Sequence, residues 1–138
     1  APPRASALAS LHPSVQLHRS GTISVQVSVS GTQPWSDSGV TVNAGTVVNI
    51  TADGIVNFGA GHIAGPTGIT TVNTDDTFIA PNLTALCLIA RIGNGLPFKV
   101  GASKRFIAKA AGRLALGAND SYFGDNSGSW TATAQIGS

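Results

Sequence analysis

The 138-residue chain contains no glutamate and no methionine, and charged residues make up only 10% of the sequence. Glutamate, lysine and methionine favour helices, whereas the valine and threonine that are plentiful here favour strands. The length is sufficient for one domain with a proper hydrophobic core. The composition therefore favours a β-rich extracellular domain over a helical cytosolic one.

The chain has a single cysteine, Cys87, so a disulfide bond within the chain is excluded. Cys87 lies in the apolar run Ala85–Ala90, which is typical of a buried strand. A catalytic thiol needs an electropositive and partly open setting, and the neighbouring sequence provides none. We expect Cys87 to be a small, inert core residue.

Strong charge and long apolar runs are also missing. The formal net charge of +2 is too small to indicate a nucleic-acid partner. The basic residues of the chain also lack the interleaved aromatic side chains of a groove that binds single-stranded nucleic acid. No apolar run is long enough for a membrane-spanning helix. The spacing of His12, His18 and His62 does not favour a zinc site.

Alternating apolar and polar residues predict strands along most of the chain. From Thr22 to Ser30, Ile23 and three valines fall on one face and polar side chains on the other. Asp53–Gly54 is a hairpin signal, and Leu83–Ile92 is the most apolar predicted strand. Further strands are predicted at residues 40–42, 46–52, 55–58, 77–80, 96–100, 104–108, 112–118 and 129–136. Short strands separated by turns predict an all-β fold, a two-sheet antiparallel β-sandwich over residues 22–138.

Two segments fit this pattern less well. Residues 1–21 contain Pro2, Pro3 and Pro13, which are incompatible with a regular helix or a central strand. We interpret them as an N-terminal extended arm with a short edge strand at residues 14–18. The arm either docks on a neighbouring subunit by strand addition or is a disordered tail. Residues 32–39 are predicted to form a loop, in which Trp35 either plugs a sandwich edge or forms a sugar platform, and we favour the structural role.

The most informative stretch is the loop from Gly117 to Trp130. It holds two of the six acidic residues, Asp120 and Asp125, and the amide side chains of Asn119 and Asn126. Hard oxygen donors on a glycine-rich loop suit Ca²⁺ better than a transition metal. The alternative is an ordinary polar turn, because Asn, Asp, Gly and Ser are common turn residues.

This loop resembles the calcium loop of the PA-IL (LecA-type) family of calcium-dependent galactophilic bacterial lectins. Asn119–Asp120, a short turn and Tyr122–Trp130 are similar to the family pattern of Asn-Asp, a turn and Thr-Tyr-Gly-Asn-Asn-Ser-Gly-Ser-Phe. Val42–Ile50 resembles the family's Asn-Pro-Gly-Asp turn and the strand after it. Ile55–Gly59 resembles its Trp-Ala-Ser-Tyr-Gly segment, and Leu88–Gly93 its strand ending in Lys-Ile-Gly. The resemblance covers about residues 21–138 and implies a small jelly roll with the calcium loop at one end.

The resemblance also implies one Ca²⁺ ion that bridges the protein and sugar hydroxyls. Asp120, Asp125 and Asn126 would supply side-chain oxygens, and Tyr122 and Phe58 would supply carbonyls. The turn after Asp120 is two residues shorter than in the family pattern. Asp125 stands where the family has the first residue of an Asn-Asn pair, and its extra carboxylate should favour the ion.

The implied sugar contacts are Asp120, Asp125, Asn126, Ser121 and His62. His62 lies near the position of a sugar-contacting loop in the family, although the His-Pro-Asp-Gln run of that loop is missing here. A galactose-type ring is expected, because its 3- and 4-hydroxyls are cis and can both reach one ion. A homo-oligomer would add avidity to weak single-site binding.

Two functions remain open from the sequence. One is a secreted calcium-dependent carbohydrate-binding domain; the start at Ala1 without methionine is compatible with a cleaved signal peptide. The other is a structural subunit of an extracellular filament or surface assembly, built by strand exchange of residues 1–21 with calcium purely structural. An enzyme is not expected, because calcium would keep both Asp120 and Asp125 ionised and glycoside hydrolysis needs a protonated carboxyl group. N-glycosylation sequences occur at Asn49, Asn82 and Asn119.

Overall fold

The computed structural model describes residues 15–17 and 22–137. Within these ranges the chain forms ten β-strands and no helix. In chain order the strands are β1 (Val15–Leu17), β2 (Ile23–Ser30), β3 (Ser36–Val42), β4 (Val47–Asn57), β5 (Ile63–Ala64), β6 (Leu88–Ile92), β7 (Phe98–Lys99), β8 (Ser103–Ile107), β9 (Gly112–Ala118) and β10 (Ser127–Ile136). No helix long and apolar enough to cross a membrane occurs in the described ranges.

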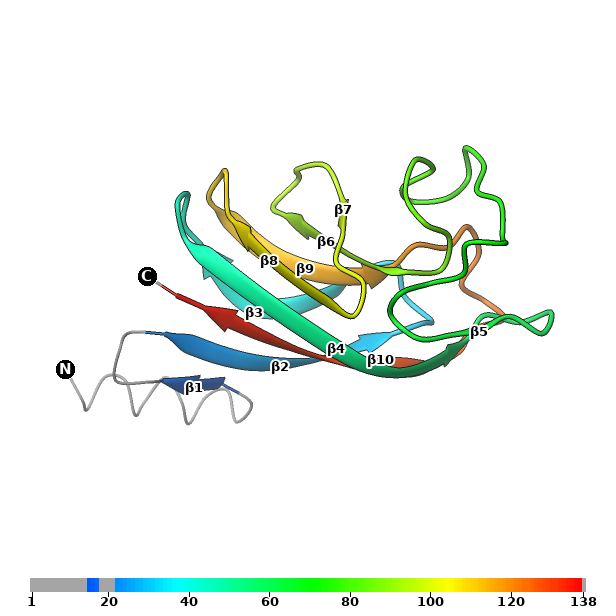
Figure 1. Cartoon of the computed structure of the whole chain (residues 1–138), viewed down its shortest axis with the longest axis horizontal. Helices are drawn as coiled ribbons and strands as arrows, with labels where there is room; N and C mark the ends of the chain where they lie inside the picture. Colours follow the sequence, from blue (N-terminus) through cyan, green and yellow to red (C-terminus); the bar gives the residue numbers. More distant parts are fainter. Residues whose placement is uncertain (1–14, 18–21, 138) are drawn as a thin grey trace.

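The strands build two antiparallel sheets that face each other as two layers (Figure 1). The six-stranded sheet has the order β1-β2-β10-β4-β5, and β8 also pairs with β4 beside β5. The four-stranded sheet has the order β3-β9-β6-β7. This arrangement confirms the prediction of an all-β, two-sheet antiparallel sandwich.

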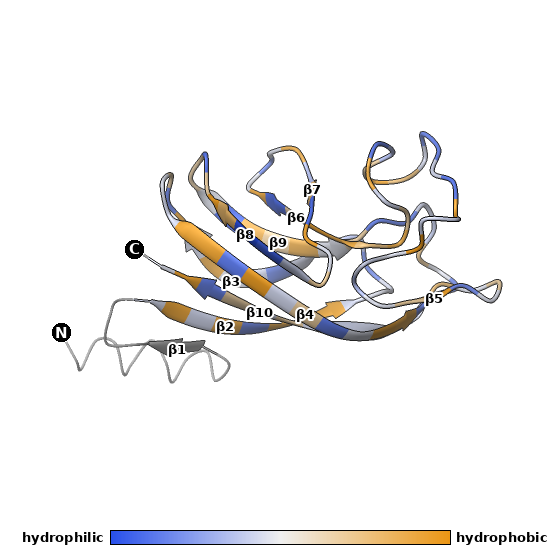
Figure 2. Ribbon diagram, in the orientation of Figure 1, coloured by the Kyte–Doolittle hydropathy of each residue, from blue (hydrophilic) through white to orange (hydrophobic). Residues whose placement is uncertain are grey.

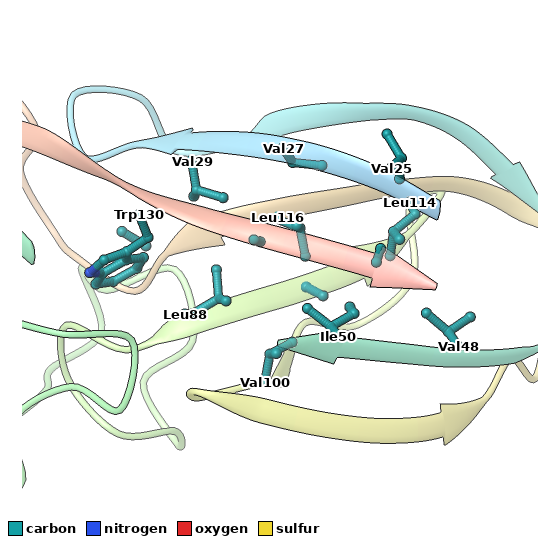
Figure 3. Close-up of a cluster of buried hydrophobic side chains, with 14 of the residues drawn as sticks. Val25, Val27, Val29, Val48, Ile50, Leu88, Val100, Leu114, Leu116 and Trp130 are labelled. Atoms are coloured by element: carbon teal, nitrogen blue, oxygen red, sulfur yellow. The ribbon is translucent and has the colours of Figure 1, made fainter. Parts of the chain in front are cut away.

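The core lies between the layers because strands from both sheets alternate in polarity, as the hydropathy colouring of β4 shows (Figure 2). In the close-up, Val25, Val27 and Val29 of β2 share the interior with Ile50 of β4 and residues of the opposite sheet (Figure 3). β10 pairs on one side with β2 and on the other with β4, so its inward residues are central. Burial of these apolar faces is the main favourable contribution to folding.

Asp53–Gly54, predicted as a hairpin, lies inside the continuous strand β4. β10 pairs with β4 without a break from Val48 to Asn57, and Trp130 lies opposite Gly54. Gly54 has φ +107, and a Cβ there would come within 3.0 Å of the Ser129 carbonyl. The local turn signal was wrong because pairing along the full strand outweighs it, and the glycine permits the close approach.

The predicted strand at residues 77–80 is also absent from the described sheets. The amide of Phe78 donates to the Asp75 carbonyl, and that of Ile79 donates to the Asp120 carbonyl. These amides donate hydrogen bonds to loop carbonyls and not to the carbonyls of a neighbouring strand. Similarly, the predicted strand at 83–92 begins only at Leu88, because Leu86 has a left-handed backbone with φ +61. The predicted loop at 32–39 is shorter than expected, since β3 starts at Ser36 and continues through a register shift after Asp37.

The connection from β9 to β10 positions the candidate site. β9 belongs to one sheet and β10 to the other, so residues 119–126 cross the end of the sandwich. The long segment between β5 and β6 lies at the same end (Figure 1). Within the predicted arm, β1 pairs with β2 of the same chain. Residues 1–14 and 18–21, on which the prediction of subunit docking also depends, lie outside the described residues.

Candidate functional site

Asn119 begins the loop between β9 and β10 and joins it to the long segment between β5 and β6. Its side chain is fully buried. Its Oδ1 accepts a hydrogen bond from the amide of Ala80 at 2.9 Å, and its Nδ2 donates to the carbonyls of Ala80 at 3.0 Å and Thr84 at 2.9 Å. Its backbone carbonyl also accepts the amide of Leu86 at 2.8 Å. Asn119 therefore acts as a structural clamp whose hydrogen-bonding capacity is used within the fold.

Asp120 places a carboxylate in a largely buried position, with 7% of the residue exposed. Its Oδ1 accepts the amide of Ser121 at 2.7 Å, and its Oδ2 accepts Nδ2 of Asn126 at 2.8 Å. The single salt bridge among the described residues joins Arg113 and Asp37, so Asp120 has no basic side-chain partner there. Burying a charged carboxylate is costly unless a positive charge is paired with it, so a bound cation would stabilise Asp120 in this position.

Asn126 completes the buried polar cluster and leaves one atom without a partner. Its Nδ2 donates to the Gly31 carbonyl at 2.7 Å as well as to Asp120, so the donor side of the amide is used. Its Oδ1 is buried and has no hydrogen-bond partner. An unsatisfied buried acceptor is costly, and native structures usually account for one by a water molecule or an ion.

Asp125 approaches the same region from the loop, next to the turn that follows β4. A Cβ placed on Gly59 would lie 2.4 Å from Oδ2 of Asp125, so the carboxylate occupies the space above this glycine. Gly59 has φ +80, which suits glycine far better than other residues. The loop and the end of β4 are therefore brought together by a contact that only a residue without Cβ allows.

Phe58 is positioned on this turn by its buried ring, whose centroid lies 5.9 Å from that of Trp130. The Phe58 amide donates to the His62 carbonyl at 2.7 Å, but the His62 amide donates to Gly59 at 2.9 Å. The His62 amide is thus not available to the Phe58 carbonyl, and the pairing of β4 with β5 stops there. The Phe58 carbonyl lies one residue from the glycine that Asp125 covers.

The remaining predicted site residues lie on the surface. Tyr122, Ser121 and His62 are all exposed. The Tyr122 ring folds over Gly124, because a Cβ on that glycine would lie 2.4 Å from the Tyr122 hydroxyl oxygen. The structure therefore brings buried oxygen donors and exposed polar groups to one end of the sandwich.

The donor chemistry of this cluster fits Ca²⁺. Among the described residues no group of three or more His, Cys, Asp or Glu side chains gathers in one place, so a site here must use amide and carbonyl oxygens. Two carboxylates, an unpartnered amide oxygen and backbone carbonyls of the same two segments are hard oxygen donors. Asp120, Asp125, Asn126, Tyr122 and Phe58 are the residues that would hold the ion.

Sequence reasoning missed the structural roles of Asn119, Gly31 and Gly59. Asn119 had been noted for its glycosylation sequence, but its buried Nδ2 is engaged with backbone carbonyls. The available signal was its place directly after the apolar strand β9 and before an aspartate. Gly31 and Gly59 lie just beyond β2 and β4, and their roles depend on contacts distant in sequence that no local pattern displays.

Two other residues singled out from the sequence lie elsewhere. Cys87 is fully buried, which confirms its predicted core position, but it lies one residue before β6 and not inside a strand. Its burial raises the pKa of the thiol to about 11. Trp35 packs against Gly117, and the Arg91 guanidinium carbon lies 4.4 Å from the centre of its ring. These contacts cover the outer face of the four-stranded sheet and agree with a structural role for Trp35.

A two-layer β-sandwich with an oxygen-rich loop at one end defines the class of this domain. Residues 19–138 match the model of the family described as PA-IL-like protein, so the chain belongs to that family. Among solved structures, it is similar to one described as the EclA N-terminal domain, a PllA-like lectin, with a TM-score of 0.64 and 23% identity. That match covers 90% of this chain and 98% of the other, and it shows a shared fold. A comparison with curated proteins gave no match.

Proposed function

We propose that this chain is a secreted, calcium-dependent carbohydrate-binding domain without enzymatic activity. The observation that carries the proposal is the buried, unpartnered Oδ1 of Asn126 beside the buried carboxylate of Asp120. Membership of the PA-IL-like family and the fold shared with a lectin support it. The low charge and the absence of glutamate support an extracellular location.

The proposed division of labour follows from burial. Asp120 and Asn126, both almost fully buried, would bind the ion on the side that faces the protein interior. Asp125, exposed beside Gly59, would both bind the ion and accept a hydrogen bond from a sugar hydroxyl. When bound, Ca²⁺ would supply coordination positions for two neighbouring hydroxyls, and a galactose-type ring with cis 3- and 4-hydroxyls suits that arrangement.

The exposed residues around this centre would then select the ligand. Ser121 follows Asp120 directly, and His62 closes the turn that carries Phe58 and Gly59. Neither side chain is buried, so both are free to contact a saccharide. We propose that His62 contacts the sugar alone, whereas Asp125 serves the ion and the sugar together.

Thermal melts with EDTA and with added Ca²⁺ test the ion first. At a calcium concentration about a hundredfold above the dissociation constant, the folded state should gain about 2.7 kcal/mol. Mg²⁺ at the same concentration is the matched control, because Mg²⁺ demands a tighter octahedral shell and should stabilise less. Coincident melting curves with Ca²⁺ and EDTA would remove the ion from the proposal.

A glycan array with Ca²⁺ and with chelator then tests the sugar. Asp125→Ala should abolish calcium and sugar binding together, whereas His62→Ala should weaken sugar binding and leave calcium affinity nearly unchanged. The same array reports the preferred sugar class. Absence of glycan binding while Ca²⁺ still raises the melting temperature would show that the ion is structural, and an assembly subunit would become the better hypothesis.

A further inference from the structure

The sandwich has a groove on one lateral edge, separate from the loop end. At this edge the six-stranded sheet presents β8 and the four-stranded sheet presents β7. A groove of about 820 Å³ lies between them. This volume is within the range of small-molecule sites, which is about 300–1,000 Å³. None of its lining residues belongs to the candidate calcium and sugar site.

The floor of the groove is aromatic and is built by both sheets. Phe98 of β7 and Phe106 of β8 meet edge to face, with ring centroids 4.8 Å apart. Among the lining residues, Leu96 is 89% exposed, and Ile107, on the face of β8 opposite to Phe106, is 62% exposed. Apolar side chains that are exposed together around an apolar cavity favour a ligand that covers them.

The polar lining of the groove carries only one sign of charge. Lys104, Arg105 and Lys109 line it, which is three of the eight lysine and arginine residues of the chain, and no aspartate does. Lys104 pairs in register with the buried Ile50, so it is on the face of β8 that points between the layers. None of the three is in a salt bridge within the described part of the chain.

This charge distribution decides between possible occupants. A second copy of the same edge would bring like charges together, which opposes association. Residues 1–14 contain Arg4 and His12 and no acidic residue, so this segment is not complementary either. Addition of a peptide strand along β8 is opposed by the lysine and arginine on that edge. An apolar chain with one anionic end satisfies both the aromatic floor and the basic lining.

We propose that this groove binds a free fatty carboxylate, with its alkyl chain on Phe98 and Phe106 and its carboxylate at Lys104. Arg105 pairs with the exposed Asn49 and lies on the opposite face of β8, and Lys109 follows the far end of that strand. Lys104 is therefore the cation that faces the space between the layers. The proposal is independent of sugar binding, because the two residue sets do not overlap. It adds a lipid-like ligand to a domain whose proposed ligand is a saccharide.

Methyl NMR with dodecanoate, kept below its micelle concentration, tests the site directly. The titration is run with EDTA, since Ca²⁺ precipitates fatty carboxylates. We expect saturable shifts at the methyl groups of Ile92, Leu96 and Ile107, with little change at the core residue Leu88. Dodecyltrimethylammonium, which has the same chain and the opposite charge, should bind at least about tenfold more weakly, a difference of about 1.4 kcal/mol.

Variants separate the charge from the apolar floor. Lys104→Gln should weaken dodecanoate binding about tenfold, and the exposed Lys109→Gln should weaken it less and is safe for folding. Leu96→Ser should weaken both amphiphiles. Arg113→Gln, a cation engaged with Asp37 outside the groove, is the matched control and should change neither affinity.

Three results would overturn the proposal. The first is equal affinity for the two amphiphiles in the wild-type protein. The second is a set of shifts spread over the whole surface without saturation. The third is binding to anionic lipid vesicles without binding to monomeric dodecanoate, which would point to a membrane surface and not to a free carboxylate.

Discussion

Asn119 and Asn126 are two buried asparagines in one loop, and the fold treats them differently. Asn119 uses Oδ1 and Nδ2 in contacts to Ala80 and Thr84. Asn126 uses Nδ2 for Gly31 and Asp120 and leaves Oδ1 buried without a partner. The same side chain thus serves as a completed clamp at one position and as an incomplete site seven residues later.

The difference separates structural from functional polarity. A buried amide with all of its partners stabilises a loop and has no capacity left for a ligand. A buried amide with a free oxygen, next to a buried carboxylate that has no basic partner among the described residues, has a cost that a cation would remove. Burial alone identifies neither role, and the hydrogen-bond partners of each atom distinguish them.

Asn119→Ala should give the largest loss of stability in this region. It leaves the amide of Ala80 and the carbonyls of Ala80 and Thr84 without their side-chain partner, so we expect a free energy of unfolding lower by about 3 kcal/mol. Urea denaturation with EDTA present measures this loss. Asn82→Ala, an exposed asparagine in the same clamped segment, is the matched control and should stay within about 0.5 kcal/mol of the wild type. Equal effects of the two variants would disprove the clamp.

Asn126→Ala should have a smaller effect without calcium and a larger effect on the ion. The variant loses two donor contacts but also removes the unpartnered oxygen, so we expect a net loss of about 1 kcal/mol in EDTA. The stabilisation by Ca²⁺ should then fall to a small fraction of its wild-type value. Paired melts of wild type, Asn126→Ala and Asn119→Ala in both conditions check this. A full calcium response in Asn126→Ala would show that its Oδ1 is not a ligand.

The sequence predicted the strands of the two sheets better than it predicted the loops and strand boundaries at the ends of the sandwich. The alternation of β2 and the presence of a strand at residues 129–136 were predicted, because a sandwich face needs period-two burial. Asp53–Gly54 misled because a local turn signal cannot report a strand that pairs over eleven residues. The strands predicted at residues 77–80 and 83–87 are wrong because the apolar residues there pack in a loop. That loop is fixed by hydrogen bonds from Asn119, which is more than thirty residues away in the sequence.

The candidate site was predictable as chemistry and less so as geometry. Asp120, Asp125 and Asn126 stand in one short stretch, and their oxygen content is evident from the sequence. The contact of Asp125 with Gly59 and that of Asn126 with Gly31 join residues 66 and 95 positions apart, and no local pattern encodes them. The groove between β7 and β8 was missed for the same reason, because its two aromatic residues come from different sheets.

The exposed salt bridge between Asp37 and Arg113 extends the comparison to a polar contact in water, where the smallest effect is expected. Its Nε–Oδ1 distance is 2.9 Å, yet both side chains are more than half exposed. The hydrogen bond from Arg113 holds the pKa of Asp37 below its ordinary value of 3.8, with a further contribution from the Gly39 amide. Because the folded pKa is depressed, the stabilisation is complete above the unfolded pKa and is lost as pH falls through the folded value. Solvent screening limits it to about 0.2–1 kcal/mol.

Urea denaturation of wild type, Asp37→Asn and Arg113→Gln at pH 7 and near pH 3 measures this effect. The stability difference between wild type and each variant should be present at pH 7 and shrink at the lower pH, and high salt should reduce it at pH 7. The double variant should add little to either single one, because both remove the same contact. A difference of several kcal/mol at pH 7 would contradict the screened range, in which case exposure would no longer separate weak polar contacts from strong ones.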